Sequence, residues 1–271
     1  MSTHPTQRKI TVPHIIEMKN KNKKIAALTA YDFLMAEMLD EAGLDIILVG
    51  DSAGMVIAGH QTTLPITMDE MLYHTKIVSR GVKRALLVAD MPFLSYQTSI
   101  EEGIKNAGRF LKEANAEAVK IEGGKAVIDL VSSLVNYGIP VMGHLGLTPQ
   151  SINKFGTYKL QGEDSETALL LKKDALLLEE AGVFSIVLEK LPTSLAKEIS
   201  ESLQIPTIGI GAGPFCDGQI LVSHDMLGIF DKFRPKFVRR YAEIGDLMRD
   251  AFSKYVHDVK KNEFPNKDES F

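Results

Sequence analysis

Acidic side chains stand at the ends of four apolar runs in this 271-residue chain. They are Asp51, Asp90, Glu122 and Glu189, and Asp51 is followed at once by Ser52. The carboxyl ends of parallel strands face one way, so these carboxylates are expected at one rim of a sheet. Neighbouring strands lie ~4.8 Å apart, which would bring the first three carboxylates within about 10 Å of one another. Such convergence is typical of a metal site.

A divalent cation would resolve the repulsion among Asp51, Asp90 and Glu122. Like charges at such distances disfavour the ionised carboxylates. Because all the candidate ligands are oxygens and no cluster of Cys or His accompanies them, Mg²⁺ is favoured over zinc. We therefore predict one Mg²⁺ per subunit, bound by Asp51, Asp90 and Glu122.

Lys120 lies two residues before Glu122, so on one strand both side chains point to the same face. A buried Lys–Glu pair is the structural alternative, although such a pair stabilises a fold little after desolvation. A metal beside an ammonium group suits an oxo-acid substrate, because the two together stabilise a developing enolate. Glu189 is then a candidate general base. His144 is a proton carrier, a hydrogen-bond partner of the substrate or a structural histidine.

Eight short β-rich runs alternate with segments whose apolar residues recur at helical spacing. The runs cover 25–29, 46–50, 86–90, 118–122, 140–144, 185–189, 206–210 and, less clearly, 219–223. This alternation predicts an α/β fold, a closed (β/α)8 TIM barrel that forms a single domain over 1–271. An open doubly wound sheet stays the alternative, because periodicity does not show closure.

Local signals agree with this order of elements. Thr67 and Ser99 each precede a glutamate by three residues, the spacing of a capping box at a helix start. Glycines separate four helical patterns from the strands that follow, where a left-handed C-cap is wanted. These glycines are Gly43, Gly81, Gly138 and Gly182.

Two strand-to-helix connections, 51–66 and 145–164, are long enough to suggest a functional role. A short N-terminal helix around 13–18 is predicted to plug the bottom of the barrel. A helical extension follows the last strand, with an apolar stripe that packs either on its own barrel or on another subunit. The stripe comprises Tyr241, Ile244, Met248, Phe252, Tyr255 and Val259. Residues 1–10 and 262–271 are expected to be flexible tails.

Composition excludes several classes of protein. Hydrophobic residues make up 45% of the chain and charged residues 24%, which argues against disorder. The net charge of −4 and the lack of a basic block argue against a nucleic-acid partner. Cys216 is the single cysteine, which fits a reducing compartment. With no apolar run of about 20 residues and no secretory signal, we expect a cytoplasmic protein without a membrane span.

Two short glycine motifs suggest other chemistry. Gly50–Gly54 matches the nucleophile elbow of serine hydrolases, with Ser52 as nucleophile. A long loop rather than a helix is expected after it, so Ser52 is interpreted as a hydroxyl donor to the substrate. Gly209–Gly213 is similar to a dinucleotide loop, but Pro214 stands where the last glycine belongs. That segment is either an anion-binding loop or a tight turn, and NAD binding is not expected.

Longer blocks carry a more specific resemblance. They are LTAYD (28–32), VGDSAGMVIAGHQTTLPITMDEMLYHT (49–75), AVKIEGG (118–124), GHLGLTPQSINKFGTYKLQG (143–162), LEK (188–190) and IGIGAGPFCDGQILV (208–222). In this order they resemble the ketopantoate hydroxymethyltransferase family over residues 9 to 256.

The resemblance implies a TIM barrel in pantothenate and coenzyme A biosynthesis. It implies that Mg²⁺ is bound at Asp51, Asp90 and Glu122, and that Glu189 accepts a proton. The keto acid, 3-methyl-2-oxobutanoate, would be held by Asp51, Ser52, Asp90 and Lys120. The co-substrate would be 5,10-methylenetetrahydrofolate, the product 2-dehydropantoate, and the assembly a homo-oligomer, commonly a decamer. His144 is added as a substrate-binding residue.

Three other classes stay open. A related metal-dependent carbon–carbon lyase on the same barrel would turn over without folate. A serine hydrolase would depend on Ser52 and tolerate chelation of metals. A ligand-binding barrel without catalysis would show no turnover.

Overall fold

A closed barrel of eight parallel strands forms the core of the computed structural model, which describes residues 8–231 and 234–271. The strands are β1 (Ile25–Thr29), β2 (Ile46–Val49), β3 (Leu86–Asp90), β4 (Ala118–Glu122), β5 (Val141–Gly146), β6 (Ser185–Glu189), β7 (Thr207–Ile210) and β8 (Gly218–Leu221). They lie in sequence order, and β8 pairs with β1. The predicted TIM barrel is confirmed, and the open doubly wound sheet is excluded.

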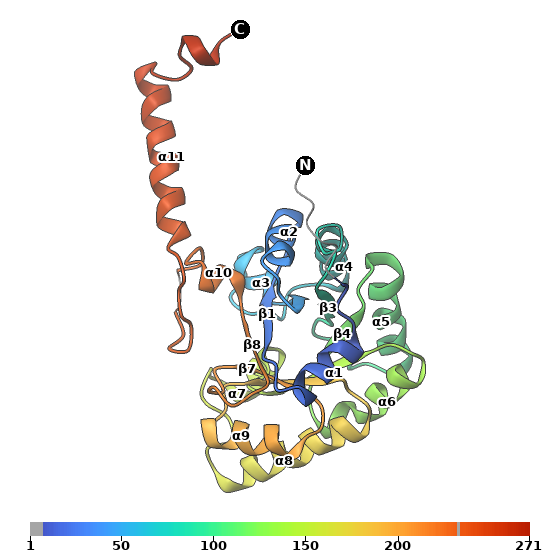
Figure 1. Ribbon diagram of the computed structural model, residues 1–271. Helices are drawn as coiled ribbons and strands as arrows, with labels where there is room; N and C mark the ends of the chain where they lie inside the picture. The colour runs from blue at the N-terminus through green and yellow to red at the C-terminus, as the bar shows by residue number, and fades with distance from the viewer. Residues whose placement is uncertain (1–7, 232–233) are drawn as a thin grey trace. The chain divides into compact units, whose positions relative to one another are not determined.

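Helices cover the outside of the barrel between successive strands (Figure 1). They are α2 (Phe33–Glu41), α3 (Ala53–Val56), α4 (Met68–Val78), α5 (Ile100–Ala114), α6 (Ile128–Asn136), α7 (Ile152–Phe155), α8 (Ser165–Glu180) and α9 (Thr193–Ser202). Two short 3₁₀ turns, η1 (Lys125–Val127) and η2 (Pro149–Ser151), precede α6 and α7. Both long connections predicted from the sequence therefore contain a short helix, α3 in the first and α7 in the second.

Alternation along each strand divides the core into two parts. On β4, Val119 and Ile121 pack outward in the cluster beneath the helices, whereas Ala118 belongs to the cluster inside the barrel. On β3, Val88 points inward in the same way. Since side chains alternate, the last inward position of each strand is Asp90 on β3 and Glu122 on β4. The apolar interior thus ends in a polar layer.

The predicted N-terminal helix is present as α1 (Val12–Asn20) and is longer than 13–18. Its Ile15 is fully buried in the cluster inside the barrel. Lys19 Nζ donates to the carbonyls of Ser200 and Ile205 over 2.8 and 2.9 Å and pairs with Asp217 at 3.0 Å. Ile205 and Asp217 lie just before β7 and β8, and Ser200 is in α9, so α1 closes the end of the barrel opposite the polar layer.

The helix-end signals are mostly confirmed. Three of the four predicted C-cap glycines have the expected geometry, and so does one of the two predicted capping boxes. Gly43, Gly138 and Gly182 have positive φ angles of 89°, 82° and 95°. The capping box at Thr67 is complete. The box at Ser99 was wrong in part: Ser99 caps the helix, but the Glu102 carboxylate accepts from Asn106 instead of closing the box.

Gly81 is required for a different reason from the predicted left-handed cap. A Cβ at Gly81 would lie 2.7 Å from the carbonyl oxygen of Phe33 and 2.9 Å from the amide nitrogen of Glu37, both in α2. These are backbone atoms and cannot turn aside. Gly81 therefore permits the close approach of the chain after α4 to α2.

Gly81→Ala is expected to lower the free energy of unfolding by about 1–3 kcal/mol, because the added methyl group forces the backbone apart. Gly108→Ala is the matched control: a Cβ there meets no atom within 4 Å, and the residue lies inside α5. Alanine should stabilise that helix by about 0.5–1 kcal/mol. Urea unfolding of both variants measures the two effects, and a neutral Gly81→Ala would contradict the close approach.

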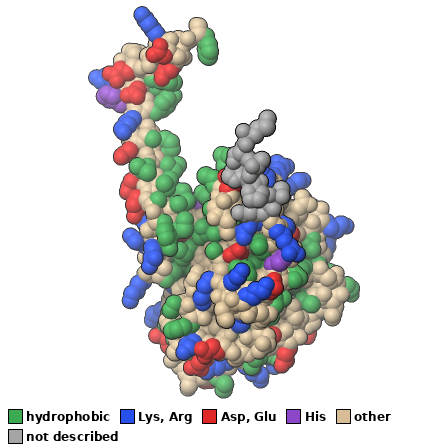
Figure 2. Space-filling view, in the orientation of Figure 1, with side chains coloured by type: hydrophobic (Ala, Val, Ile, Leu, Met, Phe, Trp, Pro, Cys, Tyr) green, Lys and Arg blue, Asp and Glu red, His purple; other side chains and the backbone are tan. Residues whose placement is uncertain are grey.

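The chain divides into two compact units, residues 1–221 and 222–271. The single domain expected over 1–271 stays a prediction. The first unit contains the barrel; the second contains α10 (Ser223–Met226), α11 (Ile244–Lys261) and a 3₁₀ turn, η3 (Lys267–Glu269). Apolar side chains gather along one side of α11 (Figure 2), as the predicted stripe requires, although Tyr241 precedes the helix.

The two segments predicted to be flexible tails, residues 1–10 and 262–271, differ in what the structure describes. Most of the predicted N-terminal tail, residues 1–7, lies outside the described residues, while Ile10 N–H donates to Arg84 O at 2.7 Å. The C-terminal tail, 262–271, contains η3, and its flexibility stays a prediction. In the described parts of the chain, no helix combines the length and the apolar character needed to cross a membrane.

Candidate active site

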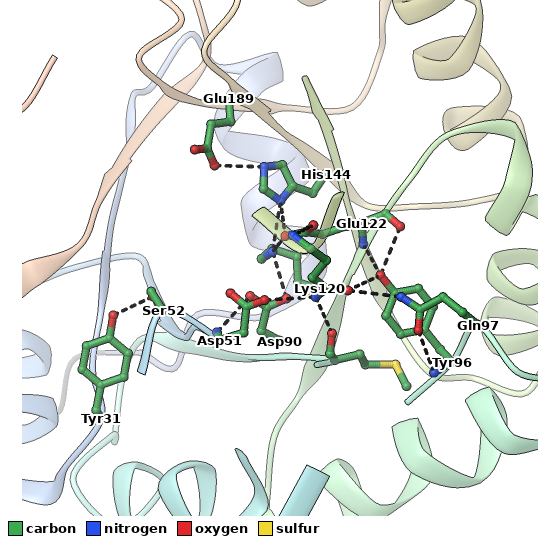
Figure 3. A network of polar contacts seen from close by, with 12 residues as sticks. Tyr31, Asp51, Ser52, Asp90, Tyr96, Gln97, Lys120, Glu122, His144 and Glu189 are labelled. Atoms are coloured by element: carbon green, nitrogen blue, oxygen red, sulfur yellow. Dashed lines mark hydrogen bonds and ion pairs between the residues drawn. The ribbon is translucent and has the colours of Figure 1, made fainter. Parts of the chain in front are cut away.

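The polar layer at the carboxyl end of the barrel is built from four neighbouring strands, β3 to β6 (Figure 3). Strand register places Lys120 beside Asp90 and Glu122 beside His144. Glu189 ends β6 on the other side of His144. These five predicted site residues therefore come together, because each takes an inward position near the end of its strand.

Lys120 is the central cation of this layer. Its Nζ lies 2.8 Å from Asp90 Oδ1 and 3.8 Å from Glu122 Oε1, and all three side chains are at most 4% exposed. Burial disfavours the ammonium form, but the neighbouring carboxylates outweigh this effect and raise the pKa of Lys120 above its usual value. Lys120 thus stays charged. The Lys–Glu pair considered from the sequence is part of a larger cluster.

Asp51 and Ser52 reach the same rim from the first turn after β2. The Asp51 N–H donates to Asp90 Oδ2 over 3.2 Å. Ser52 Oγ forms a 2.7 Å hydrogen bond with the hydroxyl of Tyr31, and Tyr31 O in turn lies 2.8 Å from His74 Nδ1. Asp51 therefore lies in the carboxylate cluster, whereas Ser52 is held at its side by a buried tyrosine.

The three predicted metal ligands carry more negative charge than Lys120 balances. Burial raises the pKa of Asp51, Asp90 and Glu122, and repulsion from neighbouring carboxylates adds to the effect at Asp51 and Asp90. Asp90 Oδ1 and Glu122 Oε1 are buried without a hydrogen bond. A cation among these oxygens would satisfy them and relieve the repulsion, so the residues fit Mg²⁺.

The cluster is wider than a compact three-carboxylate cage. A group of three acidic or histidine ligand atoms, all within 4.8 Å of one another, occurs among the described residues at His257, Asp258 and Glu263. Asp51, Asp90 and Glu122 do not meet that distance, and the Lys120 ammonium lies 2.8 Å from Asp90 Oδ1 and 3.8 Å from Glu122 Oε1. Mg²⁺ commonly keeps several water ligands, which allows a carboxylate to take part through water.

His144 connects the cluster to Glu189. Its Nδ1 lies 3.1 Å from Lys120 Nζ, and its Nε2 lies 3.2 Å from Glu189 Oε2. Burial and the charge of Lys120 lower the pKa of His144, so the imidazole is neutral. Because the Lys120 ammonium donates only, Nδ1 must accept, and the ring proton belongs on Nε2, facing Glu189. His144 therefore places its Nε2 beside the Glu189 carboxylate, at 3.2 Å but without hydrogen-bond geometry.

Sequence analysis missed two residues that contact the cluster. Gln150, in η2, donates from Nε2 to Asp51 Oδ2 over 3.1 Å and from its backbone N–H to Glu122 Oε2 over 3.0 Å. The Tyr96 hydroxyl lies 2.8 Å from Gln150 Oε1. Both residues are neutral, so a search for charged side chains passes over them. The signal for Gln150 was the length of the connection over 145–164, whereas Tyr96 lies between β3 and α5.

The two glycine motifs belong to other structures. A one-turn helix, α3, does follow Ser52, so the expectation of a long loop directly after the elbow was wrong. However, the hydrogen-bond partner of Ser52 in the described chain is Tyr31 rather than a histidine, so no nucleophile is activated there. Gly211 and Gly213 have φ angles of 63° and 80°, and the segment runs into β8 without a helix. It is a turn, which excludes a Rossmann loop.

Solved structures with the same fold are distant in sequence. A phosphonopyruvate hydrolase, solved in complex with oxalate and Mg++, aligns with a TM-score of 0.63 at 10% identity, over 96% of this chain and 93% of its own. A 2,3-dimethylmalate lyase, a member of the PEP mutase/isocitrate lyase superfamily, aligns with a TM-score of 0.61 at 15% identity, over 97% and 89%. At such identities the likeness supports the fold alone.

Sequence relatives are much closer. The family profile described as ketopantoate hydroxymethyltransferase matches residues 9–267. The 3-methyl-2-oxobutanoate hydroxymethyltransferase of Syntrophus aciditrophicus is 54% identical over the full length of both chains. The enzyme of the same name from Chlorobaculum tepidum is 55% identical over 97% of this chain and 96% of its own. The chain is therefore an enzyme of the ketopantoate hydroxymethyltransferase family.

Proposed function

We propose that this enzyme transfers a hydroxymethyl group from 5,10-methylenetetrahydrofolate to 3-methyl-2-oxobutanoate and so forms 2-dehydropantoate for pantothenate and coenzyme A biosynthesis. The full-length identity to relatives that bear the name of this reaction carries the proposal. The polar layer supports it, because a buried ammonium beside several carboxylates suits an oxo-acid and a divalent cation.

Asp51 and Asp90 would hold Mg²⁺, and Glu122 would complete the set directly or through a metal-bound water. The oxygens left without hydrogen bonds on Asp90 and Glu122 support this assignment. When bound, one Mg²⁺ per subunit polarises the keto group and stabilises the negative charge that develops on its oxygen. The position of the ion is then determined by Asp51, Asp90 and Glu122.

The protein itself would bind and orient the keto acid. Lys120 supplies a permanent positive charge at the floor of the site, where it neutralises the substrate carboxylate or the developing enolate. Ser52 supplies a hydroxyl group, and His144 forms one wall. Asp51 and Asp90 contact the substrate from the metal side. These positions surround one small, anionic molecule.

Glu189 would remove the proton from C3 of the bound keto acid. It ends β6 with its side chain 15% exposed, the most open of the charged groups in the layer. A carboxylate accepts a proton in its ionised form, and Glu189 Oε2 lies 3.2 Å from His144 Nε2. C3 then attacks the methylene carbon, which bridges N5 and N10 of the folate. Both carbon–nitrogen bonds break in turn, water supplies the hydroxyl group of the product, and the C3 proton and one proton of the water end on the two folate nitrogens.

The test is formation of 2-dehydropantoate by the purified enzyme, with folate or metal omitted in turn. We expect turnover that needs both 5,10-methylenetetrahydrofolate and Mg²⁺ and that stops when EDTA is added. Turnover of the keto acid without folate would indicate a carbon–carbon lyase instead. Ester hydrolysis that survives EDTA and disappears in Ser52→Ala would indicate a serine hydrolase, and no turnover at all a binding protein.

Tyr31→Phe is expected to raise KM for the keto acid about fivefold, while kcat changes less. The variant removes the 2.7 Å hydrogen bond to Ser52, and a neutral hydrogen bond contributes about 1 kcal/mol. Steady-state kinetics of Tyr31→Phe, Ser52→Ala and the double variant measure the effect. If Tyr31 acts through Ser52, the double variant resembles Ser52→Ala; fully additive losses would contradict this coupling.

Self-association into a homo-oligomer, with a decamer as the expected form, remains part of the proposal. Exposed apolar side chains on α2 and α4 support it, namely Leu34, Met38 and Tyr73. Light scattering of the purified enzyme tests the subunit number. Cytoplasmic location is likewise proposed and is tested by fractionation of the source cells.

A further inference from the structure

Gln150 joins the connection between β5 and α8 to two carboxylates of the site. The residue is 6% exposed. Its side chain donates to Asp51 Oδ2, and its backbone N–H donates to Glu122 Oε2. Asp51 follows β2, whereas Glu122 is the last residue of β4. One residue of a distant loop therefore fixes an oxygen atom on each of them.

The orientation of the Gln150 amide is determined by its neighbours. Nε2 donates to Met91 O over 2.9 Å as well as to Asp51, and a backbone carbonyl only accepts. Oε1 lies 2.8 Å from the Tyr96 hydroxyl and accepts from Gln97 Nε2 over 3.2 Å. Because every polar atom of this buried amide has a partner, the side chain is held in one orientation.

These hydrogen bonds divide the carboxylate oxygens into two sets. Asp51 Oδ2 and Glu122 Oε2 accept from Gln150, and Asp90 Oδ2 accepts from the Asp51 N–H. Asp90 Oδ1 and Glu122 Oε1 are buried without a hydrogen bond from the residues that the structure describes, although Lys120 Nζ lies 2.8 and 3.8 Å from them. Gln150 thus holds one oxygen of Asp51 and one oxygen of Glu122, and the second oxygen of each carboxylate receives no hydrogen bond from Gln150.

We propose that Gln150 is a positioning residue for the metal site, which holds one oxygen each of Asp51 and Glu122 so that the second oxygen of each carboxylate faces the cation. The inference rests on the proposed function, in which these carboxylates bind Mg²⁺. Ligands that are oriented before the ion arrives lose less freedom on binding, and such outer contacts typically change metal affinity 10–100-fold. Because Gln150 lies in η2, tight metal binding would also require η2 to keep its position against the barrel.

Gln150→Met tests the proposal, because methionine keeps the length of the side chain and the backbone N–H but removes the amide. Mn²⁺ is the probe, titrated into the full-length enzyme without keto acid or folate and followed by the electron paramagnetic resonance signal of the free ion. We expect the Kd for Mn²⁺ to rise about 10–100-fold. Gln161→Met is the matched control: its amide, in the same connection, donates to Lys159 O, and its Kd should equal that of the wild type.

The Kd separates positioning from a purely structural role. A variant that only destabilises the fold lowers the melting temperature and the number of sites filled, but leaves the Kd of the folded molecules unchanged. An unchanged Kd in folded Gln150→Met would overturn the proposal. Gln150→Asn, which withdraws the amide by one methylene, should show the same rise and serves if the methionine variant does not fold. Absence of Mn²⁺ binding by the wild type would reject the metal site itself together with this inference.

Discussion

Glu189→Gln is expected to slow exchange of the C3 hydrogen of 3-methyl-2-oxobutanoate by about 10²–10⁴-fold, the usual contribution of a positioned general base. Glutamine keeps the size of the side chain and the contact with His144 Nε2, but it has no carboxylate to accept the proton. Deuterium exchange in D₂O, followed by proton NMR of the keto acid, measures the step without folate. The exchange rate should fall while the fold is unchanged.

Binding measurements on the same variant locate the defect. Because Glu189 lies beyond His144 from the metal ligands, the affinities for Mn²⁺ and for the keto acid should remain within about threefold of the wild type, less than 1 kcal/mol. A variant that keeps both affinities and loses exchange supports Glu189 as the base. Exchange at the wild-type rate would assign proton removal to another group.

Asp90→Asn is expected to weaken Mn²⁺ binding by more than about 100-fold, since even residues outside the ligand shell change metal affinity 10–100-fold. Asp90 pairs with Lys120 at 2.8 Å and accepts from the Asp51 N–H, so its charge contributes to both the metal and the substrate side of the site. Keto-acid affinity should therefore fall as well. Isothermal titration with Mn²⁺, then with the keto acid, measures both losses.

Asp69→Asn provides the control for removal of one carboxylate. Asp69 lies on α4 with its side chain 82% exposed, and it pairs with Arg109 rather than with a residue of the polar layer. Its loss should leave both affinities unchanged. If Asp90→Asn bound Mn²⁺ as tightly as the wild type, Asp90 would not be a metal ligand, and the assignment of the site would have to change.

Much of the fold was predictable because its signals are local. Five of the eight predicted runs end where the strand ends, and the alternation of Val119 and Ile121 with Lys120 and Glu122 fixed which charges point inward. The convergence of these charges follows from the parallel direction of the strands alone. For that reason the barrel and its carboxylate rim could be predicted without coordinates.

Contacts between distant segments were not predictable in the same way. Gln150 meets Asp51 across 99 residues of sequence, and Tyr31 meets Ser52 across a helix and a strand. Neither residue carries a charge that marks it. Gly81 was predicted to be a left-handed C-cap because it lies between a helix and a strand in the sequence. In the structure, the backbone of α2 lies so close to Gly81 that a side chain would not fit. The Ser99 box failed because Asn106 competes for the Glu102 carboxylate.

The most direct test of the account is C3 exchange by the wild-type enzyme with and without Mg²⁺, in the absence of folate. Asp51, Asp90, Glu122 and Lys120 are proposed to bind the ion and the keto acid together, so enolisation should need both metal and protein but no one-carbon donor. We expect rapid deuterium incorporation with Mg²⁺ that falls to the background rate after EDTA and returns when Mg²⁺ is restored. Exchange that proceeds undiminished in EDTA would contradict the metal-assisted mechanism.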